Sequence, residues 1–148
     1  MTSSQDASVH ASAVLAGPRA VLIRGESGCG KSRLAFDLIL AGRAGLLAKT
    51  ILIGDDRVRL GARDGRLMVR HVTELAGMIE IRGLGIRHCE FVQEAEVGLV
   101  IDLAAPDAAR LPGPEALKIR LMGVDLPRIP VAEGWDALPL VLAFLTTT

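Results

Sequence analysis

Aromatic side chains are scarce in this chain, and charge of neither sign is in excess. Phe, Trp and Tyr make up 3% of the 148 residues, and Tyr does not occur at all, whereas half of the residues are hydrophobic. The core must therefore be built from Leu, Ile, Val and Ala. Lys and Arg together number 17, as do Asp and Glu, so the formal net charge is zero. That balance indicates neither a nucleic-acid nor a membrane-surface partner.

The sequence also lacks the features of a secreted or membrane-spanning protein. Its two cysteines, Cys29 and Cys89, have no metal-ligand spacing and fit a reducing compartment. The longest apolar stretches are broken by Gly, Pro or Arg, which argues against a transmembrane helix. The first nine residues are polar and lack the basic start of a signal peptide. We therefore expect a cytoplasmic protein, and the length predicts one domain over residues 1–148.

A phosphate-binding loop is the strongest motif in the chain, because residues 25–32 match G-x-x-x-x-G-K-[ST] at every fixed position. The predicted nucleotide-binding residues are Gly25, Glu26, Ser27, Gly28, Cys29, Gly30, Lys31 and Ser32. Glycines let several backbone N–H groups point at one phosphate, Lys31 reaches the β- and γ-phosphates, and the Ser32 hydroxyl can ligate Mg²⁺. A strand-like segment over 20–23 and a helix-like segment over 31–41 supply the context that the motif requires.

An acidic pair follows the next apolar run. Thr50–Ile53 has the pattern of a buried strand and ends in Gly54, Asp55 and Asp56. A carboxylate at the end of a buried strand beside a phosphate loop is typical of Mg²⁺-dependent phosphoryl transfer. If the two carboxylates point to opposite sides of a strand, one can ligate metal while the other accepts a proton. A solvated turn is the alternative interpretation of the same residues.

Strand patterns outnumber helix patterns in the rest of the chain. Further strands are predicted over 9–15, 58–71 (a hairpin), 78–86, 97–103, 117–121 and 126–131. Helices are predicted over 31–41, with Gly42 as the C-cap, and over 136–145. The expected fold class is α/β, mostly β, with a phosphate-loop helix and a C-terminal helix. The excess of strands argues against a regular βαβ alternation.

Guanine recognition is excluded by a missing residue type. The chain contains no Asn, so it cannot carry the Asn-Lys-x-Asp element with which GTPases read guanine, and no D-x-x-G follows the phosphate loop. ATP, or another phosphoanhydride, is therefore the expected phosphate donor, with Mg²⁺ as its ion.

A further segment points to a family. Residues 79–86, with the sequence IEIRGLGI, closely resemble the signature segment of the bacterial HPr kinase/phosphorylases. The phosphate loop, the acidic pair and Val9-His10 occur in the same order in that family, and the resemblance covers about residues 8–131. It implies a P-loop kinase core of the HPr kinase and PEP-carboxykinase type. It also implies the short, single-domain form typical of alphaproteobacteria, without the N-terminal domain of the larger members.

The resemblance also implies a reaction and its partners. Such proteins phosphorylate a serine of HPr, the small phosphocarrier of the phosphotransferase system, using ATP or pyrophosphate. Many reverse the reaction with inorganic phosphate. HPr is then the expected partner, and a homo-oligomer, hexameric in the family, is the expected assembly. Ala11, where the family often has Gly, and the short C-terminus after residue 145 leave HPr affinity and the hexamer open.

Residue roles follow from the same resemblance. Asp55 resembles the acid/base that takes the serine proton, and His10 the neighbour that tunes it. Ser32, Asp56 and Glu80 are expected to hold Mg²⁺. For His10, an ordinary surface histidine is the alternative.

Three basic residues are expected to act on phosphate. Lys31 belongs to the loop, and Arg82 and Arg128 resemble the family's phosphate-contacting arginines. On a strand Arg82 would share a face with Glu80, so an ion pair between them is the alternative. Two other functions remain open: a kinase for a small metabolite, and a nucleotide-sensing module that binds HPr or a sensor kinase with little catalysis.

Overall fold

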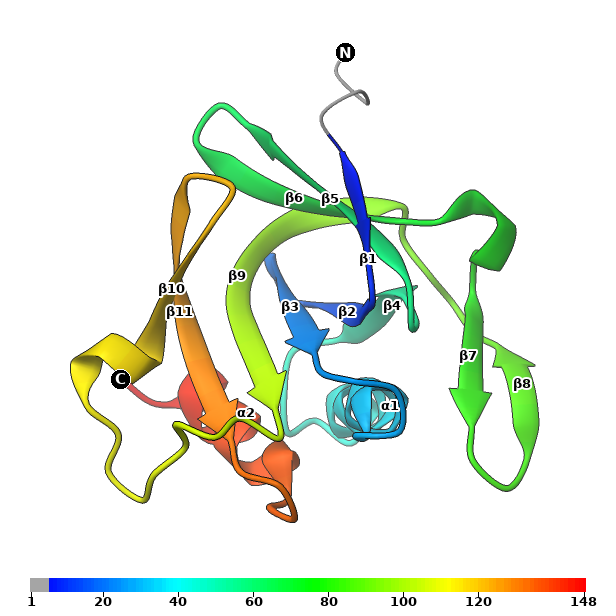
Figure 1. Cartoon of the computed structure of the whole chain (residues 1–148). Helices are drawn as coiled ribbons and strands as arrows, with labels where there is room; N and C mark the ends of the chain where they lie inside the picture. The colour runs from blue at the N-terminus through cyan, green and yellow to red at the C-terminus, as the bar shows by residue number, and fades with distance from the viewer. Residues whose placement is uncertain (1–5) are drawn as a thin grey trace.

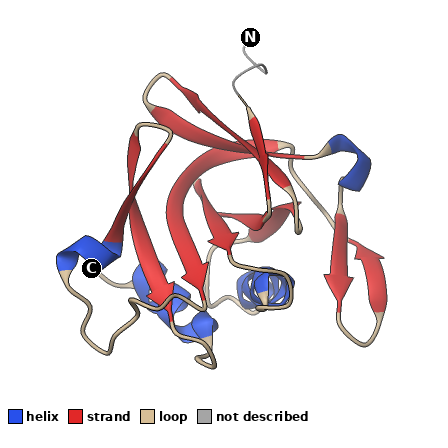
Figure 2. Ribbon diagram, in the orientation of Figure 1, coloured by secondary structure: helices blue, strands red, loops and turns tan. Residues whose placement is uncertain are grey.

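Strands dominate the computed structural model, which describes residues 6–148 (Figures 1 and 2). In chain order the strands are β1 (Ala7–Val9), β2 (Ala11–Ala16), β3 (Arg19–Arg24), β4 (Thr50–Gly54), β5 (Val58–Arg63), β6 (Arg66–His71), β7 (Met78–Ile81), β8 (Gly85–His88), β9 (Glu94–Leu103), β10 (Lys118–Leu121) and β11 (Val124–Val131). The α-helices of this part of the chain are α1 (Lys31–Arg43) and α2 (Ala137–Thr146), and 3₁₀ turns cover Thr73–Leu75 and Pro114–Leu117. The predicted strand majority with two principal helices is confirmed.

One large sheet brings several strand ends to the same edge. Its order is β1-β5-β6-β9-β3-β2-β4, and β11 pairs with the C-terminal half of β9. The strands β3, β9 and β11 are parallel, and β2 is antiparallel to both β3 and β4. The carboxyl ends of β3, β4, β9 and β11 therefore share one edge, which is where ligands bind in open α/β sheets.

Apolar clusters cover both faces of this sheet. On one face, α1 lies against β2, β3 and β4, and α2 packs against α1 and β11 (Figure 1). Leu34 and Leu38 of α1 are buried together because residues four apart share one side of a helix. Along β3, Ile23 faces the helices and Leu22 faces the second cluster, as expected of a strand buried on both sides. Each such fully buried side chain contributes about 1.5–3 kcal/mol.

Two sequence predictions are wrong at element ends. The strand predicted over 9–15 is interrupted at His10: residues 11–15 form most of β2, which pairs with β3, whereas Val9 ends the separate strand β1, which pairs with β5. Gly42 is not the C-cap, because α1 continues past it and has Ala44 as its C-cap. Gly42 has a different role, since a Cβ there would lie 2.8 Å from the backbone nitrogen of Thr50. The glycine lets α1 pack closely on β4.

Candidate active site

The phosphate loop joins the end of β3 to the start of α1. Gly30 is the N-cap of α1 and has a φ of 103°, in the left-handed region that glycine adopts without strain. Gly25 lies directly against the sulfur of Cys29, so a Cβ on Gly25 would collide with it. The loop therefore requires glycine at these two fixed positions of the motif. It leads into the N-terminus of α1, where unpaired backbone N–H groups attract anions.

Lys31 is folded into this loop. It is buried, and its Nζ donates hydrogen bonds to the carbonyl oxygens of Gly25 and Glu26 at 2.9 and 3.2 Å. An ammonium group has three N–H donors, so one donor remains for a ligand after these two carbonyls are bound. Hydrogen bonds to ionised oxygens are stronger than those to carbonyls, so a phosphate that enters the loop can compete for the Lys31 amine.

Asp55 lies within one hydrogen bond of the phosphate loop. The Ser32 hydroxyl approaches both oxygens of the Asp55 carboxylate, at 2.7 and 2.8 Å. Ser12 Oγ donates to Asp55 Oδ1 at 2.7 Å, and the backbone N–H of Glu80 donates to Oδ2 at 3.0 Å. Asp55 is only 6% exposed, and all three of these partners are neutral. A buried carboxylate without a cationic partner is suited to receive a metal ion or a proton.

The predicted metal residues are only partly brought together. Ser32 contacts Asp55, but the side chains of Asp56 and Glu80 are exposed, and Glu80 offers Asp55 its backbone amide, not its carboxylate. Within residues 6–148, no three His, Cys, Asp or Glu side chains converge to hold a metal by themselves. The oxygens of Ser32 and Asp55 nevertheless fit Mg²⁺, which binds through one or two carboxylates together with substrate phosphates.

The acidic pair does not alternate along a strand, contrary to the sequence prediction. β4 ends at Gly54, and Asp56 has a φ of 67°, so the chain turns directly after Asp55. A left-handed conformation costs a non-glycine residue about 1–2 kcal/mol. The turn is held by a hydrogen bond from the Asp56 backbone N–H to Ser12 Oγ at 3.1 Å. The turn is therefore anchored to β2 through Ser12, while the Asp56 side chain is exposed to solvent.

His10 is not placed where the sequence analysis expected it. It lies exposed in the bend between β1 and β2, and its Nε2 is 3.2 Å from Nη2 of Arg57. Ser12, two residues further on, is fully buried and makes the contact with Asp55 that was expected of His10. The sequence signal that could have revealed Ser12 is a single hydroxyl within an apolar strand, Ala11–Ala16.

Arg82 is exposed and lies in the turn between β7 and β8; Figure 1 shows this hairpin beside α1. Because β7 ends at Ile81, Glu80 and Arg82 do not share a strand face, and that expectation is wrong. The ion pair considered as an alternative is not formed between these two described residues. The Arg82 side chain is thus exposed and accessible to a ligand.

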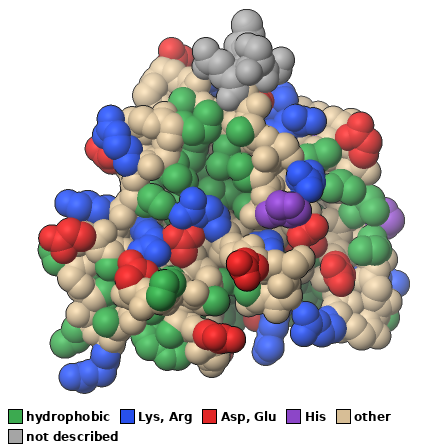
Figure 3. All heavy atoms as spheres, in the orientation of Figure 1, with side chains coloured by type: hydrophobic (Ala, Val, Ile, Leu, Met, Phe, Trp, Pro, Cys, Tyr) green, Lys and Arg blue, Asp and Glu red, His purple; other side chains and the backbone are tan. Residues whose placement is uncertain are grey.

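Arg128 is bound to two carboxylates. Its Nε donates to Asp102 at 2.5 Å, and its terminal nitrogens donate to Asp107 at 2.8 and 3.1 Å. Arg24, the last residue of β3, donates to the same Asp102 at 2.7 and 2.9 Å. We call these four residues the arginine–aspartate network; Figure 3 shows basic and acidic side chains gathered on the side of the molecule where β9 and β11 lie. The predicted contact of Arg128 with phosphate would require it to exchange one of these partners.

Charge pairing sets the pKa values within the network. Burial acts to raise the pKa of Asp102, but hydrogen bonds from Arg24 and Arg128 outweigh burial and hold that pKa below its usual value. The hydrogen bond from Arg128 lowers the pKa of Asp107, and Asp107 in turn raises the pKa of Arg128. The four side chains therefore carry opposite charges at neutral pH and neutralise one another.

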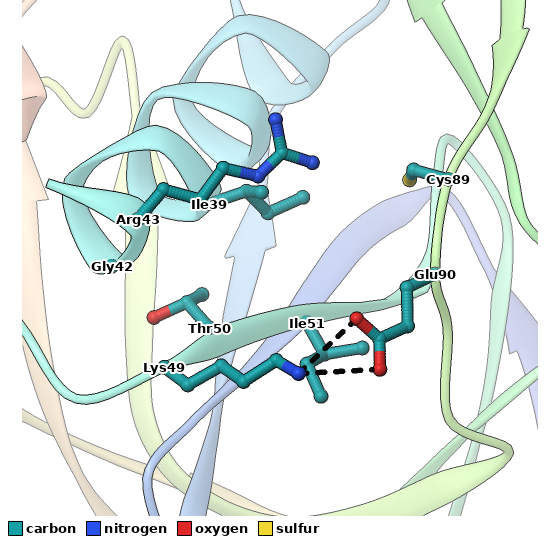
Figure 4. A pocket seen from close by; sticks show the side chains of 8 residues that line it. All are labelled: Ile39, Gly42, Arg43, Lys49, Thr50, Ile51, Cys89 and Glu90. Carbon is teal, nitrogen blue, oxygen red and sulfur yellow. Dashed lines mark hydrogen bonds and ion pairs between the residues drawn. The ribbon is translucent and has the colours of Figure 1, made fainter.

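A hollow lies beside the C-terminal end of α1 (Figure 4). Its volume is about 300 Å³, and it is lined by Ile39, Gly42, Arg43, Lys49, Thr50, Ile51, Cys89 and Glu90. Lys49 and Glu90 form an exposed ion pair at its side, and burial raises the pKa of the Cys89 thiol. The helix of 13 residues is about 20 Å long. The helix residues that line the hollow belong to the last turns of α1, whereas the phosphate loop lies at its first turn.

A glycine-rich loop between a strand and a helix, with a buried carboxylate on its serine, defines a P-loop nucleotide-binding protein. The chain belongs to the family of the HPr Serine kinase C-terminal domain, whose sequence profile matches residues 2–144. This confirms the resemblance stated from the sequence, and with it the P-loop core of that type; the alphaproteobacterial form stays a prediction.

Individual relatives give the same result. The HPr kinase/phosphorylase of Mycoplasma mycoides is 32% identical over an alignment of 128 residues that covers 77% of this chain and 39% of that protein. The HPr kinase/phosphorylase of Geobacillus thermodenitrificans is 34% identical over 128 residues, with the same coverage. The structure of the Hpr(Ser) kinase/phosphatase from Coxiella burnetii matches with a TM-score of 0.73 and 28% identity, covering 94% of this chain and 93% of that one. The chain thus spans about two fifths of the length of the two curated relatives.

None of the helices formed by residues 6–148 combines the length and apolar character needed to cross a bilayer.

Proposed function

We propose that this chain is an ATP-dependent, cytoplasmic protein kinase that phosphorylates a serine of HPr and so regulates the phosphotransferase system. The observation that carries the proposal is the contact between Asp55 and Ser32, at 2.7 Å, in a chain of the HPr Serine kinase family. A phosphate loop alone supports nucleotide binding only. A buried carboxylate at its serine adds a group that can act on the reacting atoms.

The loop residues bind the donor in this mechanism. Backbone N–H groups of residues 28–32 surround the terminal phosphates, and Lys31 exchanges the carbonyls of Gly25 and Glu26 for phosphate oxygens. Ser32, hydrogen-bonded to Asp55, would hold Mg²⁺, which when bound would neutralise charge on the transferred group. We propose Arg82 as a further donor to the phosphoryl oxygens, because its side chain is exposed at the hairpin next to Glu80.

Asp55 receives the proton of the attacking serine hydroxyl. Burial keeps water away from this carboxylate, and the hydrogen bonds from Ser12 and Glu80 fix its orientation. Correct orientation of a base relative to its proton is the main requirement for general-base catalysis. In the reverse direction, the protonated Asp55 would return its proton to the serine oxygen while inorganic phosphate takes the phosphoryl group.

The test is transfer of label from γ-labelled ATP to the HPr of the same organism. We expect the parent to label HPr on serine with Mg²⁺, and Asp55→Ala to be about 10²–10⁴-fold slower because the general base is lost. Asp125→Ala, which removes an exposed carboxylate on β11, is the matched control and should keep the parental rate. An Asp55→Ala variant with the parental rate would refute the role of Asp55.

The same assay separates the remaining alternatives. Addition of excess inorganic phosphate to labelled HPr, with detection of pyrophosphate, tests the reverse reaction. Replacement of ATP by pyrophosphate tests the second donor. An ATP-dependent complex with HPr that carries no phosphoserine, seen by intact-protein mass spectrometry, would support a nucleotide-sensing module instead. The molar mass of the protein in solution tests whether it forms the homo-oligomer that the family resemblance implies.

A further inference from the structure

We propose that Ser12 is the positioning residue of this site, which fixes the Asp55 carboxylate beside the phosphate loop. This inference rests on the proposed function and extends it to a residue outside the phosphate loop and the acidic pair. Ser12 is completely buried, and its hydroxyl contacts both residues of the pair. Removal of that hydroxyl should disturb the carboxylate without touching any group that contacts nucleotide.

The hydroxyl of Ser12 serves as donor and acceptor at once. It donates its proton to Asp55 Oδ1 at 2.7 Å and accepts the backbone N–H of Asp56 at 3.1 Å. A serine hydroxyl offers one proton and two lone pairs, so these two contacts define its orientation. The same atom therefore holds the carboxylate and the left-handed turn that carries it.

The strand pairing explains why β4 reaches Ser12. Ala13 of β2 is paired with Gly54, but the next residue, Val14, is paired with Leu52, so Ile53 is an extra residue on β4. An extra residue of this kind bends its strand and redirects the side chains that follow. Here the redirected segment is the end of β4, directly before Asp55.

The other two partners of Asp55 are less suited than Ser12 to hold the carboxylate when nucleotide binds. Ser32 belongs to the nucleotide site, and its hydroxyl is expected to turn toward the donor's metal ion. Glu80 contributes an amide from β7, which lies in a separate two-stranded sheet with β8. Ser12 is the side-chain donor that belongs to the central sheet and has no expected contact with ligand.

The experiment uses the full chain with three substitutions at Ser12 and one control. Ser12→Ala removes the hydroxyl, Ser12→Cys keeps the approximate volume with a weak donor, and Ser12→Thr keeps the hydroxyl. Thr50→Val is the matched control, since it removes a buried hydroxyl from β4 that bonds only to the Ala48 carbonyl. ADP affinity is measured by calorimetry with Mg²⁺ and with EDTA, and kcat and KM are measured for HPr phosphorylation.

We expect the substitutions that remove the Ser12 hydroxyl to weaken the Mg²⁺-dependent part of ADP affinity and to lower kcat, without affecting ADP binding in the absence of Mg²⁺. Mg²⁺ should increase the ADP affinity of Ser12→Ala and Ser12→Cys by a factor that is about 10-fold or more smaller than in the parent. The reason is that a hydrogen bond to a charged group is lost. Their ADP affinity in EDTA should stay parental. Their kcat should fall by about 10- to 100-fold with little change in KM for HPr. Ser12→Thr should recover most of both losses, and Thr50→Val should show neither.

Two results would overturn the inference. One is a Ser12→Ala protein with the parental Mg²⁺ effect and the parental kcat. The other is a loss in Ser12→Ala that Thr50→Val reproduces and Ser12→Thr does not restore, because the effect would then be general destabilisation. If the parent itself never phosphorylates HPr, the proposed function fails, while the Mg²⁺-dependent affinity for ADP still decides the role of Ser12.

Discussion

Two aspartates at the same edge of the sheet differ in the partners that hold them. Asp55, at the end of β4, accepts hydrogen bonds from two serine hydroxyls and a backbone amide. Asp102, near the end of β9, is bound by the guanidinium groups of Arg24 and Arg128. Topology alone favours Asp102, because β9 is the parallel neighbour of β3 whereas β4 is separated from β3 by β2. The hydrogen-bond partners favour Asp55 instead, because the charge of Asp102 is already paired with two arginines.

Neutral partners suit Asp55 to a reactive role, whereas cationic partners suit Asp102 to a role in stability. Neutral donors orient the Asp55 carboxylate and leave its negative charge for a metal ion or a proton. Two guanidinium groups cancel the charge of Asp102, and Arg128 extends the pairing to Asp107 in the connection before β10. Asp102 therefore links the strand that enters the phosphate loop to the irregular segment over 104–117. The comparison predicts that changes at one aspartate affect catalysis and changes at the other affect the fold.

The largest effect is expected for Asp55→Asn. The amide keeps the size of the carboxylate but cannot accept the serine proton, so HPr phosphorylation should fall by about 10²–10⁴-fold. The free energy of unfolding should change by less than about 1 kcal/mol, because the serine hydroxyls can rotate to match the amide. Steady-state kinetics and urea unfolding of the same preparation test both statements. A large loss of stability with full activity per folded molecule would reverse the comparison.

The converse substitution, Asp102→Asn, should act on stability. It leaves Arg24 partly buried without a compensating charge and leaves Arg128 paired with Asp107 alone, which costs about 3 kcal/mol. For a chain of 148 residues, that lowers the melting temperature by about 6–12 °C. Activity per folded molecule, measured well below the transition, should stay within about threefold of the parent. Calorimetry and the kinase assay together check the result, and an Asp102→Asn protein as inactive as Asp55→Asn would contradict it.

Most of the fold could be predicted because its signals are local. The phosphate loop is a contiguous motif, the hairpin of β5 and β6 carries Asp64-Gly65 at its turn, and α1 shows its apolar side at four-residue spacing. Errors lie where distant segments decide the outcome. The placement of Gly42 inside α1 depends on the approach of Thr50, which the pattern of the helix cannot show.

The site was predicted in part for the same reason. Asp55 follows a buried strand after a phosphate loop, and that order is visible in the sequence. Its partner Ser12 lies 43 residues away, and Arg24 and Asp102 are 78 residues apart, so these pairs depend on strand pairing alone. The rule that identified Asp55, a carboxylate at the end of an apolar strand, applies equally to Asp102. Only the structure shows which of the two is neutralised by arginines.

A smaller effect is expected for Arg128→Lys, which sharpens the comparison within the network. Lysine keeps the positive charge but cannot bind Asp107 through two parallel hydrogen bonds while also reaching Asp102. The free energy of unfolding should fall by about 1–2 kcal/mol. Backbone amides over 104–117 should exchange hydrogen faster, while those of α1 should change little. If phosphate binding is lost and exchange over 104–117 stays parental, Arg128 acts on the ligand, as the family resemblance implies, and not on the connection.

The smallest effect is a pH dependence that distinguishes the network from the catalytic site. The pKa of Asp102 is held below its ordinary value of 3.8 despite burial, by its bonds to Arg24 and Arg128. A carboxyl group whose pKa is lowered on folding stabilises the protein above its unfolded pKa, and this contribution disappears as pH falls through the folded pKa. The difference in unfolding free energy between the parent and Asp102→Asn should therefore be constant from neutral pH to about pH 5 and shrink below about pH 4.

Urea unfolding of both proteins across that range measures the difference directly. Asp107→Asn provides a graded comparison, because Asp107 has its pKa lowered by the same Arg128 but lies in a more exposed position. Its difference from the parent should follow the same direction with pH and be smaller throughout, since solvent screens exposed pairs. A difference for Asp102→Asn that grows on acidification would mean that the charged carboxylate destabilises the fold. That result would contradict the assignment of Asp102 to the stability of the fold.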